Sequence, residues 1–474
     1  MQSVADSLKA LAELATKPPV SVVSAAFAAA GHELALVGGP VRDAFLGRAV
    51  HDLDLTTDAT PDQILAIVAP LADAHWDIGR AFGTIGARIG GETVEITTYR
   101  SDTYDQVTRK PAVEFGTSLE TDLLRRDFTV NALALTLPAQ ILVDPSGGMD
   151  DLLASTLRTP STPEVSFGDD PLRMMRAVRF TAQLGFDVDE ETRVALGEMA
   201  GRIENISAER VNEEVSKLLR SPEPRRGIEL LVDSGLAAYV LPEVPDLRLE
   251  IDEHHHHKDV YQHSLTVLEQ AIDLEHERHA GEEPDLTLRL AALLHDIGKP
   301  ATRRLEPGGV VSFHHHDLVG SKLAKKRLRA LRYDNETIAD VARLIELHLR
   351  FFGYTDGAWT DSAVRRYVRD AGSQLERLHM LVRADVTTRN VRKADRLSFA
   401  YDDLESRIAE LAEQEQLDST RPDLDGEQIM GILNLSPGRE VGEAYRFLLE
   451  LRLEEGALGE EEATRRLTEW WSTR

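Results

Sequence analysis

The chain has 474 residues, and at about 150 residues per domain this length predicts about three domains. Its hydrophobic fraction of 42% and charged fraction of 28% are typical of a globular protein. It contains no cysteine, which excludes disulfides, thiolate zinc sites and a cysteine nucleophile.

The 81 acidic and 54 basic residues give a net charge of −27. The field of such a molecule repels phosphate, which argues against indiscriminate nucleic-acid binding. One segment differs, because residues 303–332 hold eight basic side chains and only two acidic ones. This basic stripe is consistent both with a solvated helix face and with a local contact to a polyanion. Its basic members are Arg303, Arg304, Lys322, Lys325, Lys326, Arg327, Arg329 and Arg332.

No apolar run approaches the roughly 20 residues needed to cross a bilayer. The first 30 residues carry charges between their apolar residues, and no basic segment precedes an apolar core. We therefore expect no signal peptide, no membrane partner and a cytoplasmic location.

In chain order, the first 160 residues predict a mixed domain of short strands and helices. Residues 1–30 are rich in alanine and leucine and predict a helix. Helices are expected at 40–46 and 61–71. Strands are expected at 34–37, 52–56, 83–89, 93–98 and 141–143.

Strand signals nearly vanish after a Pro/Ser/Thr stretch at 159–166. Helical periodicity follows at 170–184, 189–200, 207–219 and 224–235, and after a break at 241–253 it continues to the end. The sequence therefore predicts an α+β domain followed by an all-helical body.

A glycine pair marks the first candidate site. The apolar strand at 34–37 ends at Gly38-Gly39, and Pro40 suits the first position of a helix because it needs no hydrogen-bonded N–H. Glycines let a ligand approach the backbone, and the free N–H groups of a helix start attract phosphate. Arg42 in the first turn is expected to grip phosphate oxygens.

Two aspartates follow on the next strand. Asp52 and Asp54 are two positions apart and therefore face the same side of a sheet. Such neighbouring carboxylates repel each other unless a cation lies between them, and their oxygens suit Mg²⁺. Two metal ions about 4 Å apart stabilise the attacking and leaving oxygens of a phosphoryl transfer. Glu95, between apolar neighbours, is a candidate third carboxylate on this side.

These residues resemble the head of the tRNA nucleotidyltransferase/poly(A) polymerase family, the bacterial-type (class II) CCA-adding enzymes. Further motifs resemble the family in order, with Asp169 where the family usually has Glu. The segments are 38–43 with Asp52 and Asp54, 79–82 with 94–100, 125–132, 169–173 and 210–217. The resemblance implies a small mixed-sheet, polymerase-β-like head at 1–162, a helical neck at 163–245, an HD domain at 254–400 and a helical region at 401–474.

The resemblance also implies the reaction and its residues. An RNA 3′-hydroxyl attacks the α-phosphate of CTP or ATP, with Mg²⁺ held by Asp52 and Asp54 and assisted by Glu95. Asp170 and Arg173 read the base edge, since a carboxylate accepts from the exocyclic amine shared by C and A. The other nucleotide-site residues are Gly38, Gly39, Arg42, Asp43, Arg126, Asp127, Arg176 and Arg179, the last two near the triphosphate or as supports. The polar stretch 100–119 is expected to be the mobile loop used in switching from C to A addition.

Histidines mark a second candidate site. His295-Asp296 lies on an apolar helix, where burying both groups without a metal or a partner is costly. Residues 290–299 resemble the HD superfamily of metal phosphohydrolases, and this implies that His263, His295, Asp296 and Asp385 bind a divalent metal. His316 and His348 are candidates for extending the site to two metals. Such ligands accept Mn, Fe, Ni, Zn or Mg. The run 254–257 is interpreted as a solvated loop.

The leading hypothesis is addition of C, C and A to tRNA from CTP and ATP, with HD phosphohydrolase activity as a second function. Alternatives are a poly(A) polymerase, a CC-only or A-only enzyme, an HD phosphohydrolase with a nucleotide-binding head, and a non-catalytic RNA-binding protein. The oligomeric state stays open.

Overall fold

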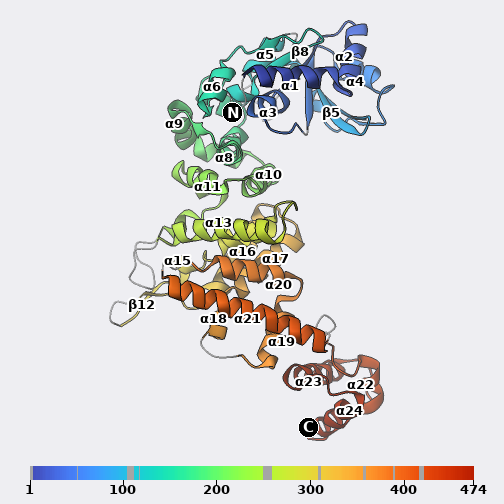
Figure 1. The fold of residues 1–474 in the computed structure, drawn as a ribbon, viewed down its shortest axis with the longest axis vertical. Coiled ribbons are helices and arrows are strands. Elements are labelled where there is room, and N and C mark those ends of the chain that lie inside the picture. Colours follow the sequence, from blue (N-terminus) through green and yellow to red (C-terminus); the bar gives the residue numbers. More distant parts are fainter. Residues whose placement is uncertain are drawn as a thin grey trace. The chain divides into compact units, whose positions relative to one another are not determined.

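The computed structural model describes residues 4–50, 52–103, 112–116, 118–248, 259–307, 311–355, 359–387, 390–415 and 421–473. It divides into two compact units, Met1–Val240 and Leu241–Arg474 (Figure 1). No helix in these ranges is both long enough and apolar enough to cross a membrane. The four domains predicted from the sequence divide these units further, and their boundaries stay predictions.

The first unit contains a seven-stranded mixed sheet in the order β3-β4-β5-β2-β1-β8-β9. Strands β2 and β5 are parallel, and the other pairs are antiparallel. Every residue of β1 is buried, as its unbroken apolar sequence predicts. The strands are β1 (Leu34–Val37), β2 (Leu53–Thr57), β3 (Ala74–Trp76), β4 (Thr84–Ile89), β5 (Glu92–Thr98), β8 (Ala134–Leu137) and β9 (Leu142–Val143).

The N-terminal segment forms two helices and not the single predicted one. Helix α1 ends at Thr16 and α2 begins at Val20, because Pro18 and Pro19 lie between them and cannot donate helical hydrogen bonds. Helix α2 packs on β1 and α4, and α4 packs on β4 and β5. The helices and 3₁₀ turns of the head are α1 (Val4–Thr16), α2 (Val20–Ala29), α3 (Gly39–Leu46), α4 (Pro61–Val68), η1 (Arg80–Phe82), α5 (Leu119–Leu124), η2 (Thr129–Asn131) and α6 (Gly148–Ala154).

The stretch 100–119 is predicted as a loop, but the structure has two paired strands within it. Strand β6 (Arg100–Thr103) pairs antiparallel with β7 (Ala112–Phe115). Residues 104–111 and 117 lie outside the described residues, as does the histidine run at 254–257. The role of this stretch in switching nucleotides stays a prediction.

Helices complete the first unit, as predicted. Helix α8 packs against both α10 and α11. A short parallel pair, β10 (Thr156–Leu157) with β11 (Asp187–Val188), joins the end of the head to the residues after α8. The helical elements are α7 (Pro163–Asp169), α8 (Leu172–Leu184), α9 (Glu190–Met199), η3 (Ala200–Asn205), α10 (Ala208–Leu219), α11 (Pro224–Asp233) and α12 (Ala237–Val240).

The second unit is almost entirely helical. Helix α13 packs on α14 and α20, and α14 also packs on α17, which pairs with α16. Its elements before the tail are η4 (Pro245–Leu247), α13 (Val260–Arg278), α14 (Leu286–Leu294), α15 (Lys299–Thr302), β12 (Arg304–Leu305), β13 (Val311–Ser312), α16 (His316–Ala330), α17 (Asn335–Leu347), α18 (Phe352–Thr355), α19 (Asp361–Ala371), η5 (Gly372–Gln374), α20 (Leu375–Ala384) and α21 (Val391–Glu415).

The last three helices share a small core of their own. Leu424, Ile429, Ala444, Leu448 and Leu467 are buried together, and Trp470 packs on them from the edge. The helices are α22 (Gly426–Leu433), α23 (Arg439–Glu455) and α24 (Glu460–Ser472).

Candidate functional site

The first unit contains a cleft of about 960 Å³. One wall is formed by the turn between β1 and α3, by β2 and β5, and by residues 126–131. The other wall consists of residues from α8, from the end of α10 and from the segment after it. The cleft therefore lies where the sheet meets the helices.

The three predicted carboxylates lie together in this cleft. Asp54 on β2 is paired in register with Glu95 on the parallel strand β5, so that both side chains point to the same face of the sheet. Asp52, just before β2, also lines the cleft. Burial, together with the charges of Glu95 and Asp52, raises the pKa of Asp54 to about 6, although the nearby cation Arg126 opposes this. An oxygen-only set whose members repel one another fits Mg²⁺.

The glycine turn is shaped as predicted, and Arg42 beside it lines the cleft while also bonding to protein groups, so its contact with phosphate stays a prediction. Gly38 has a φ of 72°, and a Cβ there would lie 3.2 Å from Nη1 of Arg126, so the turn favours glycine. Arg42 donates to both carboxylate oxygens of Asp43, at 2.9 and 3.0 Å, and to Oδ1 of Asn131 at 2.6 Å. Arg42 therefore braces the turn and the 126–131 segment against each other.

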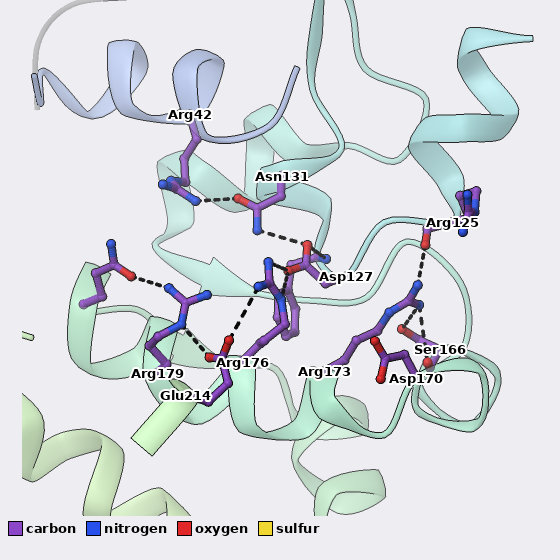
Figure 2. A network of polar contacts seen from close by, with 12 residues as sticks. Arg42, Arg125, Asp127, Asn131, Ser166, Asp170, Arg173, Arg176, Arg179 and Glu214 are labelled. Atoms are coloured by element: carbon purple, nitrogen blue, oxygen red, sulfur yellow. Dashed lines mark hydrogen bonds and ion pairs between the residues drawn. The ribbon is translucent and has the colours of Figure 1, made fainter. Parts of the chain in front are cut away.

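A chain of hydrogen bonds and ion pairs continues from Asn131 across the cleft (Figure 2). Asp127 accepts from Nδ2 of Asn131 at 3.0 Å and from Nε of Arg176 at 2.7 Å. Burial alone raises the pKa of Asp127, but the charge of Arg176 and these hydrogen bonds outweigh it and hold the pKa well below its usual range. Further along, Arg179 donates to the buried Glu214 at 2.6 Å. The sequence analysis assigns no role to Asn131 or Glu214, although both lie within the motifs at 125–132 and 210–217.

The two residues expected to read the base lie beside the cleft, and neither is among the residues that line it. Arg173 donates to the carbonyl of Arg125 at 2.6 Å and to Oγ of Ser166 at 2.8 Å. Asp170 accepts from Arg210 at 2.9 Å. Figure 2 shows both on the far side of Arg176 from Arg179. Their role in base reading stays a prediction.

The second unit brings together all six predicted HD ligands in two groups. His263, His295 and Asp385 form one group, and Asp296, His316 and His348 form the other; within each, the ligand atoms lie within 4.8 Å of one another. The two groups touch, because Nε2 of His295 is 3.2 Å from Oδ2 of Asp296.

In each of the four histidines of this site, the ring nitrogen Nδ1 contacts a backbone carbonyl or a hydroxyl group, which holds the ring in place. Nδ1 of His295 lies 2.8 Å from the carbonyl of Ala292, and the Nδ1 atoms of His316 and His348 contact carbonyls three residues earlier in the same way. Nδ1 of His263 lies 3.0 Å from Oγ1 of Thr387. A carbonyl accepts only from a protonated Nδ1, so Nε2 of the neutral ring keeps a lone pair for a metal. Thr387 had no signal in the sequence beyond following Asp385 by two positions.

The buried polar atoms of the second site fit a bound metal. Nε2 of His295 and both carboxylate oxygens of Asp296 are buried, and their contacts within the described part of the chain are to charged or ligand groups of the same site. Burial lowers the pKa of His295, but the charges of Asp296 and Asp385 outweigh burial and raise it to about 10. Lys299, 2.9 Å from Oδ2 of Asp296, adds a cation that the sequence reasoning missed. Imidazole with carboxylate suits divalent transition metals.

Comparison with known proteins identifies the domains in which the two sites lie. Family models match the Poly A polymerase head domain over residues 34–158, the probable RNA and SrmB-binding site of polymerase A over 185–247, and the HD domain over 260–398. An A-adding tRNA nucleotidyltransferase of Deinococcus radiodurans is 36% identical over 437 residues, or 90% of this chain and 92% of that protein. A CCA-adding enzyme of a Geobacillus species is 41% identical over 222 residues, but these cover only 47% of this chain and 54% of that enzyme.

Solved structures show the same architecture. The CCA-adding enzyme of Bacillus stearothermophilus in complex with CTP matches with a TM-score of 0.67 at 25% identity, over 97% of this chain and 99% of that one. The Thermotoga maritima CCA-adding enzyme complexed with tRNA shares the fold, with a TM-score of 0.60 at 19% identity over 99% of each chain.

The chain therefore belongs to the tRNA nucleotidyltransferase/poly(A) polymerase family. The predicted fold class is confirmed. A nucleotidyltransferase head and an HD domain imply dependence on divalent metal ions.

Proposed function

We propose that the protein adds C, C and A to the 3′ end of tRNA from CTP and ATP without a nucleic-acid template. The observation that carries this proposal is the face shared by Asp52, Asp54 and Glu95, in a cleft whose other wall is basic. The similarity to CCA-adding enzymes, one of them solved with CTP, supports it.

The residues of the cleft have different roles in this proposal. Asp52 and Asp54 would hold Mg²⁺, with Glu95 assisting, and Mg²⁺ held there would supply positive charge for the oxygens that exchange at phosphorus. Arg126, Lys217 and Arg220 line the cleft and supply positive charge for the triphosphate. Arg176 and Arg179 also line it, and their buried acidic partners fix where their guanidinium groups point.

Base selection rests on Asp170 and Arg173 in this proposal. Asp170 accepts from an exocyclic amine, whereas Arg173 donates to ring acceptors. A base with the wrong pattern leaves these groups unpaired, which costs binding energy. Because Asp170 is paired with Arg210, reading a base requires this ion pair to rearrange.

A second candidate is addition of the terminal A alone. The Deinococcus relative, an A-adding enzyme, is similar along nearly the whole chain, whereas the Geobacillus CCA-adding relative matches over about half. The two candidates differ in the tRNA end that they accept.

One experiment separates the candidates. The pure protein and Mg²⁺ are incubated with tRNA transcripts ending before CCA, after C and after CC, with each labelled nucleotide alone and in pairs. CCA synthesis predicts incorporation of two C and then one A, followed by arrest. Incorporation of A only, on the transcript ending in CC, supports the second candidate. Long A tails indicate a poly(A) polymerase, and no incorporation on any transcript contradicts both proposals.

We further propose that the HD site holds two divalent metal ions and hydrolyses phosphate esters. The two ligand groups around His295 and Asp296 support two ions, and Lys299 supplies charge for a phosphate. Metal content measured after dialysis is expected to approach two equivalents, falling on Asp296→Asn. A metal content unchanged by this substitution contradicts the proposed site. Phosphate release from 2′,3′-cyclic nucleotides and phosphomonoesters tests the activity separately.

A further inference from the structure

The outward face of helix α16 carries four exposed cations. Lys322, Lys325, Lys326 and Arg329 are spaced i, i+3, i+4 and i+7, which places them on one face of a helix. The opposite face is buried and includes Leu328. The sequence stripe at 303–332 therefore becomes, over these four residues, a continuous basic face.

This basic face of α16 has no neutralising partners within the part of the chain that the structure describes. None of its four cations makes an ion pair with a described acid, although the molecule carries 27 more acids than bases. Several exposed arginines elsewhere in the described part of the chain are paired with acids, such as Arg465 with Glu462. Like charges four residues apart destabilise a helix, and this face contains two such pairs. The arrangement suits an anion supplied from outside.

We propose that the basic face of α16 binds the phosphate backbone of the RNA substrate. The inference rests on the proposed function, and it assigns a place where tRNA is held. The four cations span about 10 Å along the helix, enough to meet more than one phosphate. Their side chains include no aromatic ring on which a base stacks, and three are lysines, which act as point charges. The contact is therefore independent of RNA sequence.

The test uses the full chain with Lys322, Lys325, Lys326 and Arg329 all changed to Ala. A matched control removes four cations that have acidic partners on exposed surfaces, through the changes Arg193→Gln, Arg366→Gln, Arg439→Gln and Arg465→Gln. Both variants lose the same charge, so a general electrostatic effect lowers binding equally in both. Binding of labelled tRNA is measured by filter retention between 50 and 300 mM salt.

The face variant is expected to bind tRNA at least about tenfold more weakly near 150 mM salt and to lose about two units of the slope of log K against log salt. Its KM for tRNA rises, whereas its KM for CTP and its kcat at saturating tRNA stay unchanged. The control keeps the wild-type slope. A pair variant, Lys325→Ala with Arg329→Ala, is expected to show about half of the loss and replaces the quadruple variant if that variant misfolds.

Equal tRNA affinity and slope in the face variant and the control overturn the inference. Loss of binding to phosphatidylserine vesicles without loss of tRNA binding also overturns it and indicates a membrane surface. If the wild type binds tRNA but adds no nucleotide, the proposed function fails, whereas the salt slope still decides the role of α16.

Discussion

The two candidate metal sites are built in opposite ways. In the head, carboxylates alone meet in an open cleft, where Asp52 is exposed and Asp54 is partly covered. In the helical unit, imidazoles and carboxylates meet in the interior, where His295 and Asp296 are almost completely buried. The head therefore has its ligands ready but repelling one another, whereas the HD site has its ligands already held in place by backbone carbonyls.

The difference predicts how each metal ion obtains its ligands. In the head, the substrate supplies some of them, whereas in the HD site the protein supplies most of them. Mg²⁺ keeps several waters and is shared with substrate phosphates, so an open face of oxygens is sufficient for it. Histidines fixed through Nδ1 give a metal most of its ligands from the protein. We therefore expect weak, nucleotide-assisted metal binding in the head and tight, resident metal in the second unit.

The largest predicted effect is that a substitution in either site abolishes the activity of that site and leaves the activity of the other site unchanged. Asp52→Ala removes a metal ligand from the head and is expected to slow nucleotide addition at least about a thousandfold, because the metal supplies several kcal/mol of transition-state stabilisation. Phosphate release by the HD site is expected to be unchanged. Asp296→Asn reverses this pattern. Loss of both activities in either variant shows that the two sites are not independent.

A large effect on stability is predicted for Glu214, which supports the basic wall of the cleft. Glu214→Ala leaves the buried Arg179 without its acidic partner, and breaking such a buried ion pair costs about 3–5 kcal/mol. Chemical unfolding measures this loss. Glu190→Gln, which breaks an exposed pair with Arg193, is the control and is expected to leave unfolding unchanged. The double change Glu214→Leu with Arg179→Met is expected to recover much of the loss.

If Glu214→Ala unfolds like the wild type, the ion pairs across the cleft are dispensable. The cleft is then held by packing alone. It would differ from the HD site in that no ion pairs are needed to hold its residues in place.

The sequence predicted the residues that carry chemistry better than the contacts that they make. Strand periodicity predicts one face for Asp52 and Asp54, and apolar neighbours make Glu95 a candidate for the same side. The register of β2 with β5 pairs Asp54 with Glu95. The sequence analysis misses strand β8 (Ala134–Leu137). Leu133, Leu135 and Leu137 alternate there, but Ala134 between them is also apolar, so the apolar/polar alternation of a half-buried strand is weak. The hydrogen bond from Arg42 to Asn131 has no signal in the sequence, because the two residues are 89 positions apart and only tertiary structure brings them together.

The support of the HD ligands predicts a smaller effect. Thr387→Val keeps the side-chain shape but removes the partner of Nδ1 of His263. Loss of such a partner is expected to weaken metal affinity about tenfold or more. Competition with a fluorescent chelator measures the affinity. Thr266→Val on the same helix as His263 removes only a hydroxyl bond to the backbone and is expected to bind metal normally. Equal metal affinities in the Thr387→Val and Thr266→Val variants contradict the view that hydrogen bonds hold the HD ligands in place before the metal binds.

The smallest effect tests whether the head carboxylates repel one another. The pKa of Asp54 is raised to about 6 in the folded chain, above its unfolded value, so ionised Asp54 destabilises the fold at pH 7 and this cost fades as the pH falls below 6. In EDTA at pH 7, Asp54→Asn is therefore expected to stabilise the protein by about 1 kcal/mol. The same change on the exposed Asp52 gives a smaller gain. Mg²⁺ with nucleotide reverses the order, because only the wild type gains binding energy from them. If Asp54→Asn is less stable than the wild type in EDTA, the head carboxylates do not repel one another. The head then resembles the HD site, whose ligands are held in place without metal.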